Sequence, residues 1–97
     1  MNSIFKLLGD ENRYRIFTYL LKNGQTCVCD LQKLLDMKQA NLSKHLMRMR
    51  QEGVVDSTKI NRFVHYKISE EFTNNNKELI SYIDRIEPEC KLDNCNC

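Results

Sequence analysis

Residues 38–53, KQANLSKHLMRMRQEG, carry the pattern that decides the fold. Leu42, Leu46 and Met49 recur at i, i+4 and i+7, which predicts a helix with one buried apolar stripe. Gly53 closes this helix, because glycine tolerates the left-handed backbone at a helix end. The opposite face carries Ala40, Ser43, Lys44, Met47, Arg48 and Gln51. Small and polar residues near the start of such a face can enter the major groove of DNA, and basic residues can reach phosphates.

Three helical segments precede this stretch. The first covers about residues 2–8, and the second starts at a capping Asp10 and stops at Asn23-Gly24. The third is a brief segment that follows TCVCDL, residues 26–31, and ends before a turn at Asp36 and Met37. A short helix, a turn and a second helix with a basic outer face predict a helix-turn-helix.

The sequence after Gly53 changes period. VVDSTKINRFVHYKIS is rich in β-branched and aromatic residues, and Asn61 lies where a tight hairpin turn is needed. Two short strands are expected, and a β-hairpin after a helix-turn-helix is a wing. Leu79, Ile83 and Ile86 then share one face of a last helix, which Pro88 terminates. The predicted fold class is mainly α with a small β-hairpin, a winged helix-turn-helix.

Length and charge bound the function. Ninety-seven residues make one domain near the lower end of what buries a sufficient core alone, so an oligomer is expected. Residues 38–67 hold seven Lys or Arg against two Asp or Glu, whereas residues 70–97 hold three against seven. This asymmetry is typical of a protein with one face toward an anionic partner. The chain shows no signal peptide and no apolar run long enough to span a bilayer, so a cytoplasmic protein without a membrane partner is expected.

Four segments resemble, in order and spacing, the ArsR/SmtB family of winged-helix metal-sensing repressors. They are LGDENRYRIFTYLL, TCVCDL, NLSKHLMRMRQEGVV and RFVHYKIS, and the resemblance covers residues 4–86. The resemblance implies a repressor and not an enzyme. It also implies a homodimer built largely from the first and last helices, which binds double-stranded operator DNA when no inducer is bound. The residues expected at DNA are Gln39, Ala40, Ser43, Lys44, Arg48, Arg50, Lys59 and Arg62. Of these, Gln39, Ser43 and Lys44 are expected at base edges, and the four arginines and lysines that follow mostly at phosphates.

TCVCDL places Cys27 and Cys29 at the start of a helix. Free cysteines pack like small apolar residues, which is the structural alternative to a thiolate pair. A helix N-terminus lowers the pKa of a thiol and so makes thiolate ligands available near neutral pH. Residues at i and i+2 of a regular helix point to different faces, so Cys27 should lie at or before the cap, or ligand binding must unwind the first turn. Within the family, Cys-Val-Cys-Asp-Leu resembles the thiolate site of arsenite sensors and of cadmium or lead sensors.

The chain departs from the family pattern at the third ligand. Arsenite sensors often carry a cysteine three residues after the second, and here that position is Gln32. The family's zinc site uses His on the last helix, whereas His45 and His65 lie elsewhere and are expected to be structural. The polar tail, residues 88–97, is expected to be mobile beside a domain of residues 1–87. Its cysteines are the candidates to complete the metal site: Cys90, Cys95 and Cys97.

The sequence therefore predicts a repressor released by a soft metal or metalloid, with arsenite favoured and no cofactor required. Trivalent arsenic takes about three thiolates, whereas cadmium would need two from the tail. Cadmium or lead remains an alternative inducer. An oxidant or persulfide acting through a disulfide of Cys27 or Cys29 is a further alternative. A thiol oxidoreductase is a poor candidate because the chain has Cys-x-Cys and not Cys-x-x-Cys beside a βαβ pattern. A metalloid scavenger is disfavoured by the basic helix and wing.

Overall fold

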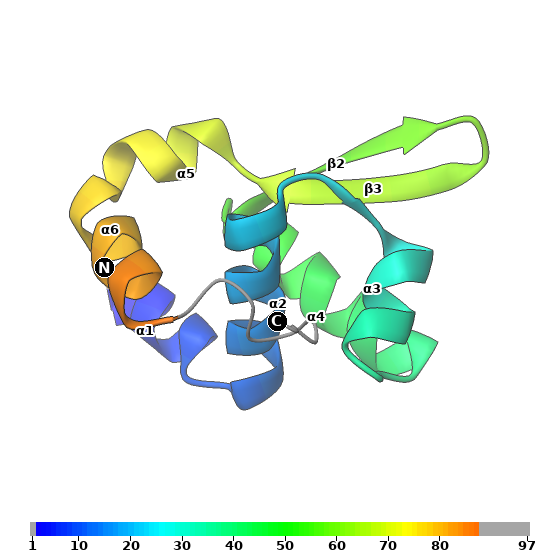
Figure 1. Cartoon of the computed structure of the whole chain (residues 1–97), viewed down its shortest axis with the longest axis horizontal. Coiled ribbons are helices and arrows are strands. Elements are labelled where there is room, and N and C mark those ends of the chain that lie inside the picture. Colours follow the sequence, from blue (N-terminus) through cyan, green and yellow to red (C-terminus); the bar gives the residue numbers. More distant parts are fainter. Residues whose placement is uncertain (1, 88–97) are drawn as a thin grey trace.

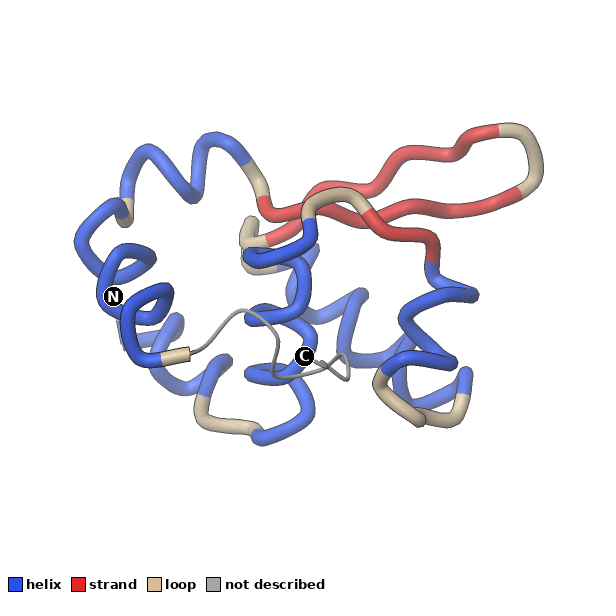
Figure 2. Tube along the Cα trace, in the orientation of Figure 1, coloured by secondary structure: helices blue, strands red, loops and turns tan. Residues whose placement is uncertain are grey.

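The computed structural model describes residues 2–87 (Figure 1). Its helices are α1 (Asn2–Leu8), α2 (Glu11–Asn23), α3 (Val28–Leu34), α4 (Gln39–Gln51), α5 (Glu70–Asn75) and α6 (Lys77–Ile86). Its strands are β1 (Thr26–Cys27), β2 (Val55–Ile60) and β3 (Phe63–Ile68). In Figure 2 the β2–β3 hairpin extends to one side above α3 and α4, while α1, α5 and α6 gather at the other end. The mainly helical fold with a wing is confirmed.

The core forms between α2 and α4, as the periodicity predicts. Ile16 and Phe17 of α2 are fully buried, and so are Leu42 and Met49 of the predicted stripe on α4. Phe72 of α5 packs edge-on against Phe17, with ring centroids 6.0 Å apart. Burying these side chains is the main source of the stability that holds α4 in place.

The predicted caps and turns are present. The Asp10 side chain accepts hydrogen bonds from the backbone N–H groups of the first turn of α2. Gly24 and Gly53 follow α2 and α4 with φ of +78°, a conformation that glycine adopts without a steric penalty. Asn61 has φ of +60° in the hairpin turn. Asp36, in the turn between α3 and α4, has φ of +53°.

The sheet has a third strand that the sequence pattern does not predict. β1 is only two residues long and pairs antiparallel with β3, placing Thr26 opposite Tyr66 and Cys27 opposite His65. The strand order is β1-β3-β2, so β3 lies in the middle. A two-residue strand is too short to show an alternating pattern of apolar and polar residues. The sequence therefore predicts only the hairpin, whereas the structure has a three-stranded sheet.

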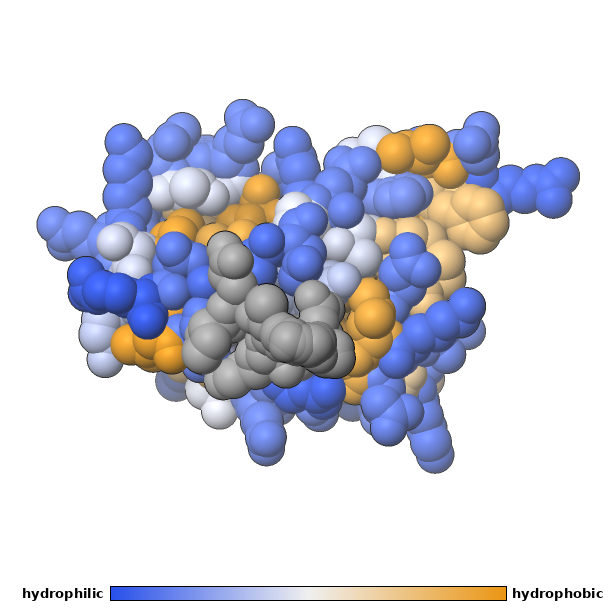
Figure 3. Space-filling view, in the orientation of Figure 1, coloured by the Kyte–Doolittle hydropathy of each residue, from blue (hydrophilic) through white to orange (hydrophobic). Residues whose placement is uncertain are grey.

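A separate short helix, which the sequence pattern does not predict, precedes the last helix. Ser69 begins α5 by accepting a hydrogen bond from the Phe72 N–H at 3.2 Å, and α6 begins only at Lys77. On α6, Ile83 is buried but Ile86 is 48% exposed, so the predicted apolar face is covered only in part by the described residues. Figure 3 shows apolar atoms at the end of the molecule where α1 and α6 lie. Within residues 2–87, no helix is long and apolar enough to cross a membrane.

Candidate DNA-binding face and thiol site

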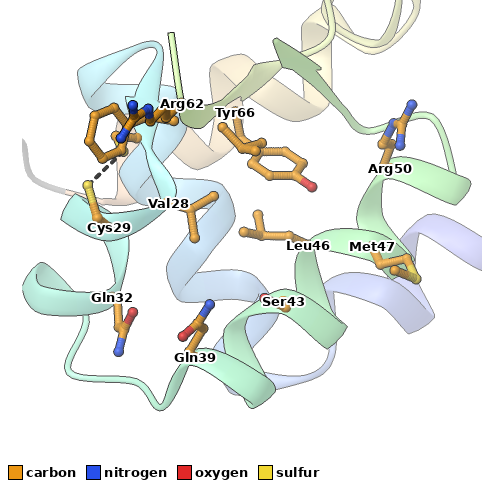
Figure 4. Close-up of a pocket in the computed structure, with 13 residues that line it drawn as sticks. Val28, Cys29, Gln32, Gln39, Ser43, Leu46, Met47, Arg50, Arg62 and Tyr66 are labelled. Atoms are coloured by element: carbon orange, nitrogen blue, oxygen red, sulfur yellow. Dashed lines mark hydrogen bonds between the residues drawn. The ribbon is translucent and has the colours of Figure 1, made fainter. Parts of the chain in front are cut away.

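A hollow of about 530 Å³ lies between α3, α4 and β3 (Figure 4). The start of α3 contributes Cys27, Cys29 and Gln32 to its wall. Six residues line it from α4 and the hairpin turn, and four of them are predicted DNA contacts: Gln39, Ser43, Arg50 and Arg62. The fold therefore brings the two thiols and half of the predicted DNA-binding residues into one hollow.

The two thiols converge because Cys27 lies outside the regular helix. Cys27 is the N-cap residue of α3 with an extended backbone, φ −68° and ψ 142°, as the prediction for a thiol pair at this position requires. Its Sγ lies 2.7 Å from the Sγ of Cys29, and an S–H···S hydrogen bond joins them. Cys27 is 8% exposed, whereas Cys29 is exposed, and both are free cysteines. A ligand from solvent therefore meets Cys29 first.

The pKa values of the two thiols move in opposite directions. The hydrogen bond from Cys29 lowers the pKa of Cys27 and outweighs desolvation, and the N–H groups of Cys29 and Asp30 act in the same direction. The same hydrogen bond raises the pKa of Cys29, with desolvation and the charge of Cys27 adding to the shift. The expectation that the helix N-terminus lowers both is therefore wrong for Cys29, because one proton is shared between the two sulfurs.

The third ligand of the predicted metal site is not among residues 2–87. No group of three or more His, Cys, Asp or Glu side chains in this range could hold a metal ion. Gln32 occupies the wall of the hollow where the family pattern often has a cysteine. The other predicted ligands, Cys90, Cys95 and Cys97, lie outside the described residues. His45 accepts a 3.5 Å hydrogen bond from Arg13, in keeping with a structural histidine.

The predicted DNA-binding residues are all exposed. Those on α4 are Gln39, Ala40, Ser43, Lys44, Arg48 and Arg50, and those on the hairpin are Lys59 and Arg62. Arg48 has an acidic neighbour, since its Nε lies 3.6 Å from the Glu52 carboxylate. Met47, which helix spacing places on the face opposite the buried stripe, is not among the predicted DNA contacts, yet it is 59% exposed in the middle of this face.

Comparisons with known proteins agree with this architecture. Residues 10–57 match the family described as bacterial regulatory protein, arsR family. The chain is 41% identical over 66 residues to the arsenical resistance operon repressor of Escherichia coli (strain K12), covering 68% of this chain and 56% of that protein. It is 40% identical over 68 residues to the cadmium resistance transcriptional regulatory protein CadC of Lactococcus lactis subsp. lactis, covering 70% and 57%. The chain thus matches less than two thirds of the length of either relative.

A solved structure extends the match to most of the chain. HlyU from Vibrio cholerae N16961 superposes with a TM-score of 0.74 at 30% identity, covering 86% of each chain. This superposition covers a larger share of the chain than either sequence match. With the helix-turn-helix, the wing and these matches taken together, the chain belongs to the ArsR family of bacterial regulatory proteins.

Proposed function

We propose that this protein is a homodimeric transcriptional repressor that leaves its operator DNA when arsenite binds to cysteine thiolates. The observation that carries the proposal is the position of the thiol pair. The two sulfur atoms lie 2.7 Å apart in the same hollow as Gln39, Ser43 and Arg50 of α4. The similarity to an arsenical resistance repressor and to a cadmium resistance regulator supports a soft metal or metalloid as the inducer.

The chemistry of the pair suits a thiophilic ion. Three thiols condense with arsenous acid to form three As–S bonds and release three water molecules, with no change in oxidation state. Cys27 and Cys29 supply two of these sulfurs, and one of Cys90, Cys95 and Cys97 supplies the third. The lowered pKa of Cys27 provides a thiolate beside the exposed Cys29, and softness disfavours magnesium, calcium and manganese at such a site.

The site is coupled to DNA binding over a short distance. Drawing Cys27 and Cys29 onto one atom changes the start of α3, which shares the hollow with the exposed face of α4. A coupling free energy of about 1–3 kcal/mol between inducer and operator is typical of such systems. By linkage, operator DNA must weaken arsenite binding by the same factor.

An uncovered apolar surface at the other end of the molecule supports the proposed dimer. Phe5 of α1 and Tyr82 and Ile86 of α6 are exposed apolar side chains, and a second copy would cover them. Two helix-turn-helix units then read half-sites about 34–36 Å apart, or a multiple of that spacing. We expect Lys44→Ala to alter sequence preference, and Arg62→Ala to weaken binding to all sequences and flatten the salt dependence. Equal losses on cognate and random DNA for both variants would contradict these roles.

The decisive test measures operator binding by fluorescence anisotropy while arsenite is added to the reduced protein. Cys29→Ser is the sharper variant, because Cys29 is exposed whereas Cys27 is buried and paired in β1. We expect Cys29→Ser to keep operator affinity and to lose release by arsenite. Lys33→Ser, on an exposed position of the same helix, should keep both. Release of Cys29→Ser with unchanged arsenite sensitivity would place the sensing site elsewhere.

The same titration separates the other inducers that this thiol pair supports. A second arm of the experiment replaces arsenite with cadmium. A cadmium ion bound by four thiolates would require two of them from residues 88–97. Hydrogen peroxide replaces it in a third arm, where it would oxidise Cys27 and Cys29 to a disulfide and be reduced to two water molecules. Release by peroxide at lower concentration than by either metal would favour a redox sensor of the same fold.

A further inference from the structure

Met47 is a large apolar side chain that remains 59% exposed on α4. Three hollows open on this side of the molecule, and Met47 lines each of them. One is the hollow beside the thiols, and the second lies toward Arg13 and Lys44. The third is bounded by Arg50 and Met47 together with Gln51. Met47 is therefore the ridge that separates these depressions.

Helix geometry puts this ridge at the centre of the exposed face. Gln39 and Ser43 line the hollow on one side of Met47, while Lys44 and Arg48 line the hollow on the other side. With about 100° between successive residues, position 47 falls between the line through 39 and 43 and the line through 44 and 48. Met47 therefore stands at the centre of the surface that α4 would present to a DNA groove under the proposed function.

The charged side chains around Met47 indicate what kind of partner could cover it. Lys44, Arg48 and Arg50 stand around it, and Glu52 is held in an ion pair with Arg48 at 3.6 Å. A cationic rim favours a polyanion over an apolar protein partner. The apolar group that a DNA major groove offers is the C5-methyl of thymine. Methionine suits such a contact because its unbranched thioether chain adapts to the position of the methyl group.

We propose that Met47 is a specificity-determining residue that contacts a thymine methyl group in each operator half-site. This inference rests on the proposed function, since it requires sequence-specific binding to double-stranded DNA. It adds an apolar contact at the middle of α4 to the polar contacts expected from Gln39 and Ser43. It also gives a role to Met47, whose exposed side chain does not contribute to the core.

The test begins by selecting an operator from random duplex DNA with the full-length protein. Each thymine of that operator is then replaced, one at a time, by deoxyuridine, which removes only the C5-methyl group. We expect one replacement per half-site to weaken wild-type binding about fourfold, the effect of losing one buried methyl group. Met47→Gln, which keeps the length of the side chain but not its apolar end, should bind without distinguishing thymine from uracil at that position.

Lys44→Ala is the matched control on the same face. It should bind more weakly or with altered preference, yet keep the fourfold penalty for uracil. If Met47→Gln shows the same uracil penalties as the wild type at every position, or if no thymine position responds in the wild type, the assignment of Met47 is wrong. Selection of no specific sequence would instead overturn the proposed function, and the inference with it. Because Met47 is exposed, loss of folding is not expected to confuse these outcomes.

Discussion

Gln32→Cys offers a direct test of the incomplete thiol site. Position 32 lies one helical turn after Cys29 and lines the same hollow, so a thiol there lies on the same face of α3 as Cys29. Cysteine is smaller than glutamine, and the substitution therefore adds no atoms to a packed region. The variant is best studied in a chain truncated after Glu87, which removes the three distal cysteines. Tyr14 holds Glu87 by a 2.7 Å hydrogen bond, so the described fold keeps its last anchor.

The size of the effect follows from counting thiols. A thiol tethered by a flexible segment has an effective concentration on the order of 1 mM. In the truncated chain at about 10 μM, the third thiol must come from another molecule, so arsenite binding should weaken about 100-fold. Gln32→Cys restores a third thiol on the same rigid helix and should return the affinity to at least the full-length value. This gain corresponds to about 2.7 kcal/mol.

Isothermal titration of arsenite into the reduced, truncated protein gives the affinity, and operator anisotropy gives the release. Gln32→Ser is the control for size and polarity, and Lys33→Cys is the control for adding a thiol one residue away, outside the hollow. Neither should restore tight binding. The reasoning fails if Lys33→Cys gains as much as Gln32→Cys, or if truncation alone leaves the affinity unchanged.

Three other variants probe the electrostatics and the core. Cys29→Ala in the truncated chain should raise the pKa of Cys27 toward its ordinary value of 9.0, because the hydrogen bond that stabilises the Cys27 thiolate is lost. Thiolate absorbance against pH measures this pKa, and an unchanged titration curve would mean that the hydrogen bond from Cys29 does not lower it. Tyr14 has its pKa raised to about 12 by burial and by its hydrogen bond to Glu87, so it stabilises the fold below pH 10 and loses this effect as pH rises toward 12. Denaturant unfolding should show Tyr14→Phe to be less stable by about 1 kcal/mol at pH 7, with the difference shrinking above pH 10. Leu46→Ala, at a buried position of α4, should lower the free energy of unfolding by about 2–5 kcal/mol, and a loss below 1 kcal/mol would mean that α4 does not depend on this contact.

The parts of the fold that depend on local sequence could be predicted. The stripe of Leu42 and Met49, the Asp10 cap and the Asn61 turn each follow from a few neighbouring residues, and the structure contains all of them. The missed elements lack such a signal. β1 has two residues and forms only because β3, far along the chain, supplies its partner. α5 is a six-residue segment rich in asparagine, whose helical state depends on packing of Phe72 in the core.

The candidate site divides in the same way. The spacing of Cys27 and Cys29 predicted that the first would lie at the cap, and the structure confirms it. The opposite pKa shifts of the two thiols could not be predicted, because they come from a specific hydrogen bond and not from the helix alone. That Arg62 of the hairpin and Ser43 of α4 border the same hollow as the thiols depends on tertiary packing, which no local pattern encodes.

The two-residue strand β1 has a mechanical consequence. Cys27 belongs at once to the ladder with β3 and to the cap of α3, so its backbone joins the wing to the helix-turn-helix. A displacement of Cys27 must either break its pairing with His65 or rotate the hairpin with it. Backbone amide exchange in β3 therefore reports events at the sulfur atoms: faster exchange would mean a broken ladder, and unchanged protection would mean that the wing travels as a rigid body. If the proposed function holds, movement of this one residue would withdraw both elements expected to face DNA, α4 and the wing.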